Sequence, residues 1–201
     1  MPQQRVATFL NEVLVLDLGR GTVNNLKATA AASYEGTYEQ LIKKIVNGSL
    51  IHADETRVTM KAGVGYVWVF TSLEDVAFVY ASSREGSLVR SLLKDFKGVL
   101  VSDFYAVYDS VNCPQQKCII HLIRDLNDEL AKEPFNDELK DLVSDFAILV
   151  KAIVATVDRF GLKSRFLRSH KKSVDHFFKS LAEREYRSEP AVKYKLRLEK
   201  N

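Results

Sequence analysis

The chain has 201 residues, of which 46% are hydrophobic, and its formal net charge is +3 at pH 7. A hydrophobic content of this size excludes a disordered chain and is sufficient for one core with a helical appendage. No apolar stretch approaches the length of a membrane span and the N-terminus lacks a signal-peptide pattern, so we expect a cytoplasmic protein.

The N-terminal segment, residues 1–48, is predicted to be helical. Residues 17–27 resemble the turn and second helix of a helix-turn-helix, with Thr22 as the residue that caps the helix. The first helix of such a motif is poor in the sequence upstream. A helix that only packs against the rest of the protein is therefore the alternative.

Three strands are expected next, and an acidic side chain follows the first. An apolar run leads directly into Asp54, and His52, two residues earlier, shares its face of the strand. Glu55 is expected on the opposite face or in the turn. Residues 66–70 and 76–80 are aromatic and β-branched runs separated by five residues, which predicts a hairpin.

A helix and a fourth strand follow the hairpin. Residues 82–85 fit a capping box, and Gly98 is placed to end the helix after an apolar stripe at helical spacing. The fourth strand, residues 99–102, leads directly into Asp103. A helical crossover lays a new strand parallel to one already in the sheet, so we expect the fourth strand beside the first. Asp54 and Asp103 would then be neighbours.

Two aspartates at the ends of neighbouring strands form a candidate metal site. Carboxylate oxygens are the ligands that Mg²⁺ prefers, and two rigidly held carboxylates can share a divalent cation. Asp54 and Asp103 lie 49 residues apart, since 103 − 54 = 49. The alternative is that each aspartate only caps the turn after its strand.

A helix beginning at Phe104 and a short strand at residues 117–120 complete the predicted sheet. The predicted order of elements is that of the ribonuclease H-like fold: three antiparallel strands, a helix, a strand, a second helix and a last strand. We therefore predict an α/β protein with a mixed five-stranded sheet and flanking helices, and a core at residues 49–130. His121 and Arg124 lie one turn apart on the next helix, where both could reach a phosphate near the site.

The remaining residues, 131–201, are predicted to form a helical region. Asn136 caps a helix whose apolar stripe runs to Phe160, and Gly161 ends it. The stripe needs an apolar partner. That partner is either a basic helix over residues 163–187, packed as an antiparallel hairpin, or another subunit.

Five basic residues gather in a stretch that contains no acidic residue: Lys163, Arg165, Arg168, Lys171 and Lys172. On a helix they would form a basic face beside an apolar one, which suits contacts with phosphate groups. A solvated helix surface is the alternative.

Residues 50–126 resemble the catalytic core of the insertion sequence 66 family of bacterial transposases. The matching strings are residues 52–56, the aromatic strand around Trp68, residues 96–108, and residues 118–121 with Arg124, in the family's order and at about its spacing. Weaker similarity extends back to about Leu10 and forward to the C-terminus.

Members of that family carry two aspartates and a glutamate on a ribonuclease H-like fold. The resemblance implies that Asp54 and Asp103 bind two Mg²⁺ or Mn²⁺ ions. It implies DNA as partner, at the transposon ends and the target, together with further copies of this chain or a full-length transposase. It also implies a bacterial protein that associates with the nucleoid when bound to DNA.

Three residues near the two aspartates are candidates for support of the site. His52 could orient Asp54 or bind DNA, with a core histidine as the alternative. Glu55 is expected to be a surface group or a group that supports the site, and not a ligand. Tyr105 is expected to pack against the sheet, with a hydroxyl that reaches the DNA backbone as the alternative.

The family's glutamate lies in an Asn-Asn-x-x-Glu motif after a long helical insertion, and the 201 residues do not include that motif. Our leading hypothesis is a transposase that cuts and joins DNA strands. The alternative is a catalytically incomplete remnant that binds DNA or a full-length partner. In a third hypothesis, the chain is an unrelated helical interaction module. Its long apolar helix would then be a dimer interface, and the aspartates would only cap turns. A glutamate within residues 129–199 could replace the missing acid, for example Glu129, Glu133 or Glu138.

Overall fold

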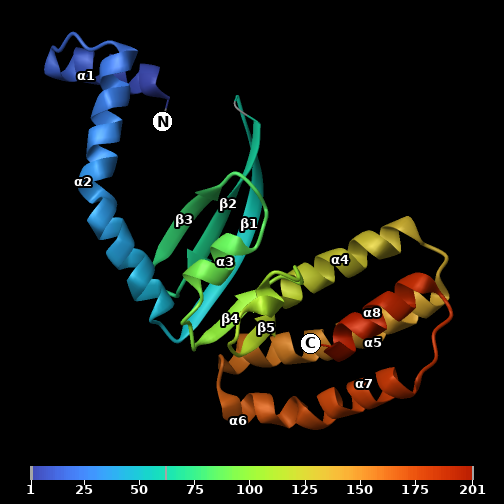
Figure 1. The fold of residues 1–201 in the computed structure, drawn as a ribbon. Helices are drawn as coiled ribbons and strands as arrows, with labels where there is room; N and C mark the ends of the chain where they lie inside the picture. The colour runs from blue at the N-terminus through green and yellow to red at the C-terminus, as the bar shows by residue number, and fades with distance from the viewer. Residues whose placement is uncertain (1, 62, 201) are drawn as a thin grey trace. The chain divides into compact units, whose positions relative to one another are not determined.

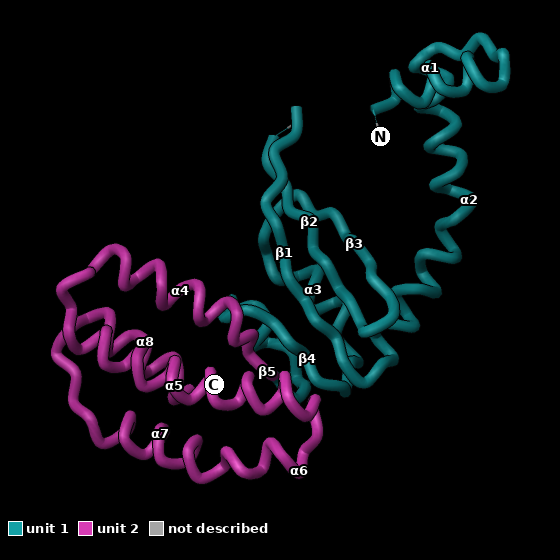
Figure 2. The backbone as a smooth tube through the Cα atoms, turned by 180° about the vertical axis from the view of Figure 1, so that it is seen from behind, with its two compact units in different colours: residues 1–115 teal, residues 116–201 magenta. Residues whose placement is uncertain are grey.

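The computed structural model describes residues 2–61 and 63–200, and the chain divides into two compact units, residues 1–115 and 116–201 (Figures 1 and 2). The predicted three-part division into residues 1–48, 49–130 and 131–201 stays a prediction. Among the described residues, no helix is long and apolar enough to cross a membrane.

The first unit begins with two helices, α1 (Gln3–Leu14) and α2 (Arg20–Val46). The side chain of Asn11 closes the loop between them, since its amide group bonds both the N–H and the carbonyl of Leu18. The prediction that Thr22 caps the second helix is wrong. Helix α2 begins two residues earlier, after Gly19 in an extended conformation, so Thr22 lies within its first turn.

A five-stranded sheet follows, with the strand order β3-β2-β1-β4-β5. Its strands are β1 (Leu50–Met60), β2 (Gly63–Thr71), β3 (Val76–Ala81), β4 (Val99–Ser102) and β5 (Gln115–Lys117). Strands β1, β2 and β3 pair antiparallel, whereas β4 pairs parallel to β1. This is the order expected of the ribonuclease H-like fold, and the prediction of an α/β protein with a mixed five-stranded sheet is confirmed.

The core of the first unit lies between one face of the sheet and helix α3 (Ser87–Leu92). Alternate residues of the strands point to this face, as Ile51 and Ala53 do on β1 and Trp68 and Phe70 on β2. Their large apolar side chains are removed from water, and this burial is the main source of stability for the sheet.

Gly98 fixes the place where β4 joins the sheet. A Cβ atom at this position would lie 2.5 Å from the carbonyl oxygen of Ser49, which no real side chain could tolerate. The close approach lets the N–H of Val99 donate to that same carbonyl at 2.9 Å. The register of β4 beside β1 is therefore set at its first residue.

Two predicted helices of this unit differ from the structure. The capping box at residues 82–85 is wrong: α3 begins at Ser87 after Gly86, and Arg84 instead pairs with Glu55. No α-helix begins at Phe104, where the chain turns and forms only a 3₁₀ turn, η1 (Tyr108–Ser110). The Asp103 side chain accepts the N–H of Tyr105 at 2.9 Å, a local bond that competes with helix formation.

The second unit is helical. Its elements are α4 (Ile119–Lys132), α5 (Asp137–Phe160), α6 (Ser164–Leu167), the 3₁₀ turn η2 (Arg168–His170), α7 (Lys171–Glu183) and α8 (Glu189–Lys200). The predicted fifth strand at residues 117–120 lies two residues too late, because Ile119 already begins α4.

Helix α5 has the predicted ends. The Asn136 side chain accepts the N–H of Leu139 at 3.1 Å, and Gly161 ends the helix with a φ of 71°, a backbone conformation that favours glycine. Helix α7 runs antiparallel to α5, with Thr156 bonded to His170 at one end and Asp145 to Arg184 at the other. The predicted antiparallel partner is confirmed, but it is broken into three pieces and is not one continuous helix.

Candidate functional site

The pairing of β1 with β4 brings the two predicted metal ligands to equivalent positions. His52 pairs with Val101, an offset of 49 residues since 101 − 52 = 49, and Ile51 pairs with Leu100 at the same offset. Asp54 and Asp103 are also 49 residues apart, so Asp103 follows β4 at the position opposite Asp54. The paired residues end at His52 and Val101, and continuing the same register by two residues puts both aspartates at the same level of neighbouring chain segments.

Each aspartate is oriented by a backbone bond from its own segment. Asp54 is exposed and its Oδ1 accepts the N–H of Glu55 at 2.9 Å. Asp103 is half-buried and its Oδ1 accepts the N–H of Tyr105, also at 2.9 Å. These bonds restrict the rotation of each carboxylate, which suits a pair of preformed ligands.

The hydroxyl of a buried tyrosine contacts Glu55 and lies within electrostatic range of both aspartates. The Tyr108 hydroxyl is fully buried, and burial raises its pKa well above the usual value for tyrosine. A hydrogen bond to Glu55 and the negative charges of Glu55, Asp103 and Asp54 raise this pKa further. Three carboxylates thus act on one hydroxyl group.

Glu55 lies on the opposite face of β1 from Asp54, which was one of the two predicted positions, and of its two predicted roles that of a surface group is wrong. Its side chain is only 3% exposed and forms an ion pair with Arg84. The Tyr108 hydroxyl donates to its second carboxylate oxygen at 2.7 Å. The hydrogen bond to Glu55 raises the pKa of Arg84, so the guanidinium group stays charged.

The other predicted supporting residues lie near the aspartates. His52 is exposed on the same face of β1 as Asp54. Tyr105 is half-buried, its hydroxyl donates to the Arg84 carbonyl at 2.9 Å, and the Arg84 guanidinium lies 4.1 Å from its ring centre. Tyr105 also meets Tyr108 edge to face.

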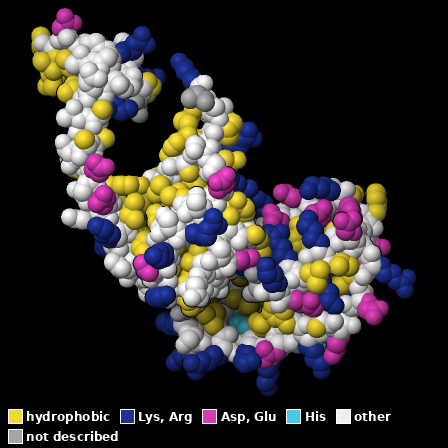
Figure 3. Space-filling model, in the orientation of Figure 1, with side chains coloured by type: hydrophobic (Ala, Val, Ile, Leu, Met, Phe, Trp, Pro, Cys, Tyr) yellow, Lys and Arg dark blue, Asp and Glu magenta, His cyan; other side chains and the backbone are white. Residues whose placement is uncertain are grey.

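The predicted phosphate-binding residues all lie in the second unit. His121 and Arg124 occupy the first half of α4, with Arg124 exposed. The five basic residues are exposed on and around α6, η2 and the start of α7: Lys163, Arg165, Arg168, Lys171 and Lys172. In Figure 3, which has the orientation of Figure 1, Lys and Arg side chains lie on the surface of the second unit near α6.

The break at η2 changes how these basic residues are presented. They do not lie on one continuous helix face, because the chain passes from α6 through a 3₁₀ turn into α7. The apolar residues between them pack as expected, since the Phe166 ring stacks on Phe160 with centroids 4.2 Å apart. Lys171 is paired with Asp175 at 2.7 Å, which weakens its contribution to anion binding.

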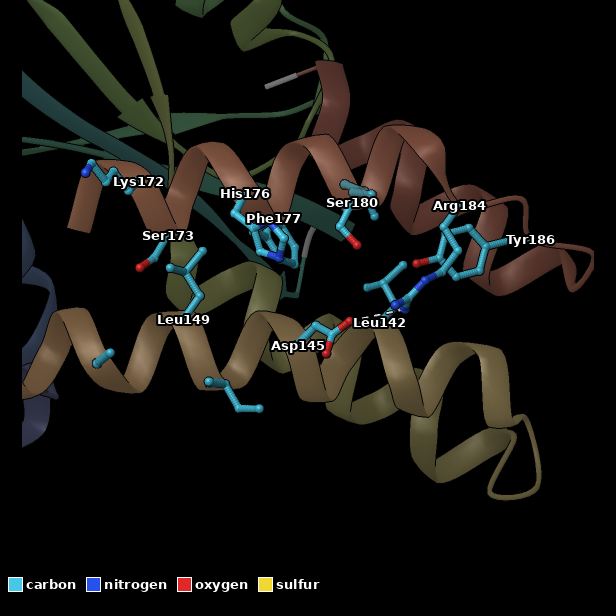
Figure 4. Close-up of a pocket in the computed structure, with 13 residues that line it drawn as sticks. Leu142, Asp145, Leu149, Lys172, Ser173, His176, Phe177, Ser180, Arg184 and Tyr186 are labelled. Atoms are coloured by element: carbon cyan, nitrogen blue, oxygen red, sulfur yellow. Dashed lines mark hydrogen bonds and ion pairs between the residues drawn. The ribbon is translucent and has the colours of Figure 1, made fainter.

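A groove between α5 and α7 has no counterpart in the sequence analysis (Figure 4). Its volume is about 560 Å³, and its lining includes Leu149, His176, Phe177, Ser180 and Arg184. The lining mixes apolar side chains with the polar ones of His176, Ser180 and Arg184, and only the packing of α7 against α5 brings them together, so the sequence pattern of either helix alone does not reveal the groove.

The donor chemistry of the aspartate pair fits a hard divalent cation such as Mg²⁺ or Mn²⁺, which takes carboxylate oxygens. Asp54 and Asp103 are the residues that would hold it. Within residues 2–61 and 63–200, no group of three or more acidic, histidine or cysteine side chains is arranged to hold a metal ion.

The three glutamates considered as a third acid are engaged inside the second unit. Glu129 pairs with Lys193 at 3.0 Å, and this hydrogen bond lowers its pKa. The Glu133 carboxylate accepts from the Asn136 side chain at 2.8 Å. Glu138 accepts the backbone N–H groups of residues 187 and 188 at 2.9 and 2.7 Å.

Comparison with known proteins gives one family. The sequence pattern of the family described as "Transposase IS66 family" matches residues 1–197. No curated protein matches the chain. Among solved structures, a chain of the simian T-cell lymphotropic virus intasome, determined by cryo-electron microscopy in complex with PP2A regulatory subunit B56 gamma, aligns with 12% identity and a TM-score of 0.29. The alignment covers 63% of this chain and 48% of that chain.

Proposed function

Because the chain belongs to the IS66 family of transposases, we propose that it carries two aspartates of a metal-dependent site that cuts and joins DNA strands. The observation that supports the proposal is the parallel register of β1 and β4, whose offset of 49 residues, from His52 to Val101, equals the spacing of Asp54 and Asp103. The resemblance found in the sequence singles out the same two residues. Their common effect on the buried Tyr108 hydroxyl gives further support.

The roles of the chain's own residues follow from their positions. Asp54 and Asp103 would hold the cation, each with one oxygen oriented by a backbone N–H. A divalent cation held there supplies activation of a water or a DNA 3′-hydroxyl and stabilisation of the leaving oxygen. His52 shares the exposed face with Asp54, so it is placed to contact the DNA backbone or to orient that carboxylate.

The exposed basic residues of the second unit would bind the DNA backbone. Lysine and arginine neutralise phosphates without reading sequence, so this contribution to affinity is independent of base sequence and sensitive to salt. The residues assigned to it are Lys163, Arg165, Arg168, Lys171, Lys172, His121 and Arg124. In the part of the chain that the structure describes, the exposed Arg165 and Lys172 form no ion pair with an acidic residue, and the same holds for Lys163 and Arg168.

The proposed partners are the DNA of transposon ends and target, and further copies of this chain or a full-length transposase. A bacterial origin and a place at the nucleoid when bound to DNA belong to the same proposal.

The test is DNA strand cleavage and joining by the full-length gene product with Mg²⁺ or Mn²⁺. We expect activity to be lost in Asp54→Asn and in Asp103→Asn and retained in Asp95→Asn, a matched change at an exposed aspartate of the first unit. Activity that survives in both site variants would contradict the proposal. Salt-sensitive DNA binding without any cleavage would favour the alternative, a transposase remnant that binds DNA and catalyses nothing.

A further inference from the structure

The ionic network around Glu55 lies between the segments that carry the two aspartates. Glu55 directly follows Asp54 on β1, and its carboxylate accepts from Arg84 Nε at 2.9 Å and from the Tyr108 hydroxyl at 2.7 Å. Arg84 comes from the loop before α3, and Tyr108 lies five residues after Asp103. One side chain thus joins three separate parts of the first unit.

The surroundings of Glu55 argue against a role as metal ligand. Its side chain is 3% exposed, whereas the Arg84 side chain is 47% exposed. A buried carboxylate is stable only when its oxygens are paired and hydrogen-bonded, and here both oxygens already have donors. The alternating strand geometry also directs Glu55 away from the face that carries Asp54.

Two routes connect the Glu55 carboxylate to the segment that holds Asp103. The first is direct, through the Tyr108 hydroxyl. The second passes through Arg84, whose guanidinium lies over the Tyr105 ring and whose carbonyl accepts the Tyr105 hydroxyl at 2.9 Å. The N–H of Tyr105 in turn donates to Asp103 Oδ1 at 2.9 Å. The second route therefore ends on the aspartate itself.

We propose that Glu55 is a positioning residue, which ties the backbone after Asp54 to the turn after Asp103 and so fixes the separation and orientation of the two aspartates. The inference rests on the proposed function, since it concerns the same pair. It adds Arg84, Tyr105 and Tyr108 as the groups through which Glu55 acts. None of these residues needs to touch the cation or the DNA.

The turn after Asp103 explains why such a tie is needed. The chain between Asp103 and η1 belongs to no strand or α-helix, and its backbone bonds are those of turns, in which the N–H groups of residues 108 and 109 donate to the carbonyls of residues 105 and 106. A short loop of this kind samples several conformations unless side chains anchor it. Tyr108 is fully buried against Trp68, with ring centroids 6.1 Å apart, so it anchors the end of the turn.

The test compares two tyrosine variants that each lose one hydroxyl. Tyr108→Phe keeps the buried ring and removes the donor to Glu55. Tyr38→Phe is the matched control, because its hydroxyl also donates over 2.7 Å but to the Phe78 carbonyl on the edge strand β3. The readouts are Mn²⁺ affinity, from the electron paramagnetic resonance signal of free Mn²⁺, and hydrogen exchange of the Tyr105 amide without metal.

We expect Mn²⁺ affinity to fall on the order of tenfold in Tyr108→Phe, as is typical when the support of a ligand is lost, and the Tyr105 amide to exchange faster. Tyr38→Phe should match the wild type in both measurements. Arg84→Lys keeps the positive charge but loses the planar guanidinium group, which stacks on Tyr105 and donates through two N–H groups to Glu55. Its Mn²⁺ affinity should therefore lie between that of the wild type and that of Arg84→Ala. A folded Tyr108→Phe protein with wild-type affinity and exchange would overturn the inference.

The Asp54→Asn variant separates this inference from the proposed function. If Asp54→Asn abolishes Mn²⁺ binding while Tyr108→Phe and Arg84→Ala bind as the wild type does, the metal site stands and the positioning role of Glu55 is wrong. If Asp54→Asn binds Mn²⁺ like the wild type, the proposed function is wrong, and the positioning role falls with it.

Discussion

Removing the Glu55 carboxylate should destabilise the first unit by an amount that depends on Tyr108. In Glu55→Ala, the fully buried Tyr108 hydroxyl loses its partner, which costs about 1–3 kcal/mol. The Arg84 side chain is 47% exposed and regains water, so its lost ion pair adds little. We therefore expect Glu55→Ala to lower the free energy of unfolding by about 1–3 kcal/mol.

The double variant Glu55→Ala, Tyr108→Phe gives the sharper test. It has no orphaned hydroxyl, so it should be less destabilised than the sum of the two single changes by about 1–2 kcal/mol. Urea unfolding can be followed by the fluorescence of Trp68, the chain's single tryptophan, which packs against Tyr108 in the first unit. Additive effects, within about 0.5 kcal/mol, would refute the reasoning, because they would mean that the two groups do not share a bond.

Two further outcomes are expected in the second unit. Burial and the charges of Glu129 and Asp125 raise the pKa of Tyr194 to about 12 from the usual 10.0. The protonated Tyr194 hydroxyl therefore contributes fully to the free energy of unfolding below pH 10, and this contribution is lost as the pH rises toward 12. Tyr194→Phe should flatten this alkaline loss in thermal unfolding curves, and an unchanged pH profile would show that Tyr194 is not its cause. For DNA binding, Arg165→Ala and Lys172→Ala should each reduce the salt dependence by about 0.9 in the slope of log K against log salt, whereas Lys94→Ala, a change at an exposed lysine of the first unit, should not. If the slope of log K against log salt is the same in all three variants, the basic stretch is not part of the DNA interface.

The sequence predicted those features that depend on short-range patterns. The spacing of Asp54 and Asp103 matches the strand register, because a crossover through one helix leaves little choice of neighbour for the fourth strand. Helix α5 begins and ends as predicted, since Asn136 and Gly161 act through their own neighbouring backbone.

The features that sequence reasoning missed depend on contacts between distant residues. Glu55 is buried because its partners, Arg84 and Tyr108, lie 29 and 53 residues away and come together only in the fold. The prediction of a capping box at residues 82–85 is wrong for the same reason. Arg84 pairs with the distant Glu55, and α3 begins only at Ser87. The basic helix is interrupted at η2, and the charge pattern of the stretch carries no sign of this break.

The most direct test of the central claim, that Asp54 and Asp103 together hold a divalent cation, is a Mn²⁺ titration of the wild type and three variants. We expect weak binding in the wild type, a loss of more than about tenfold in affinity in both Asp54→Asn and Asp103→Asn, and no change in Asp95→Asn. Unchanged Mn²⁺ affinity in the two site variants would contradict the claim, because the cation would then be bound elsewhere.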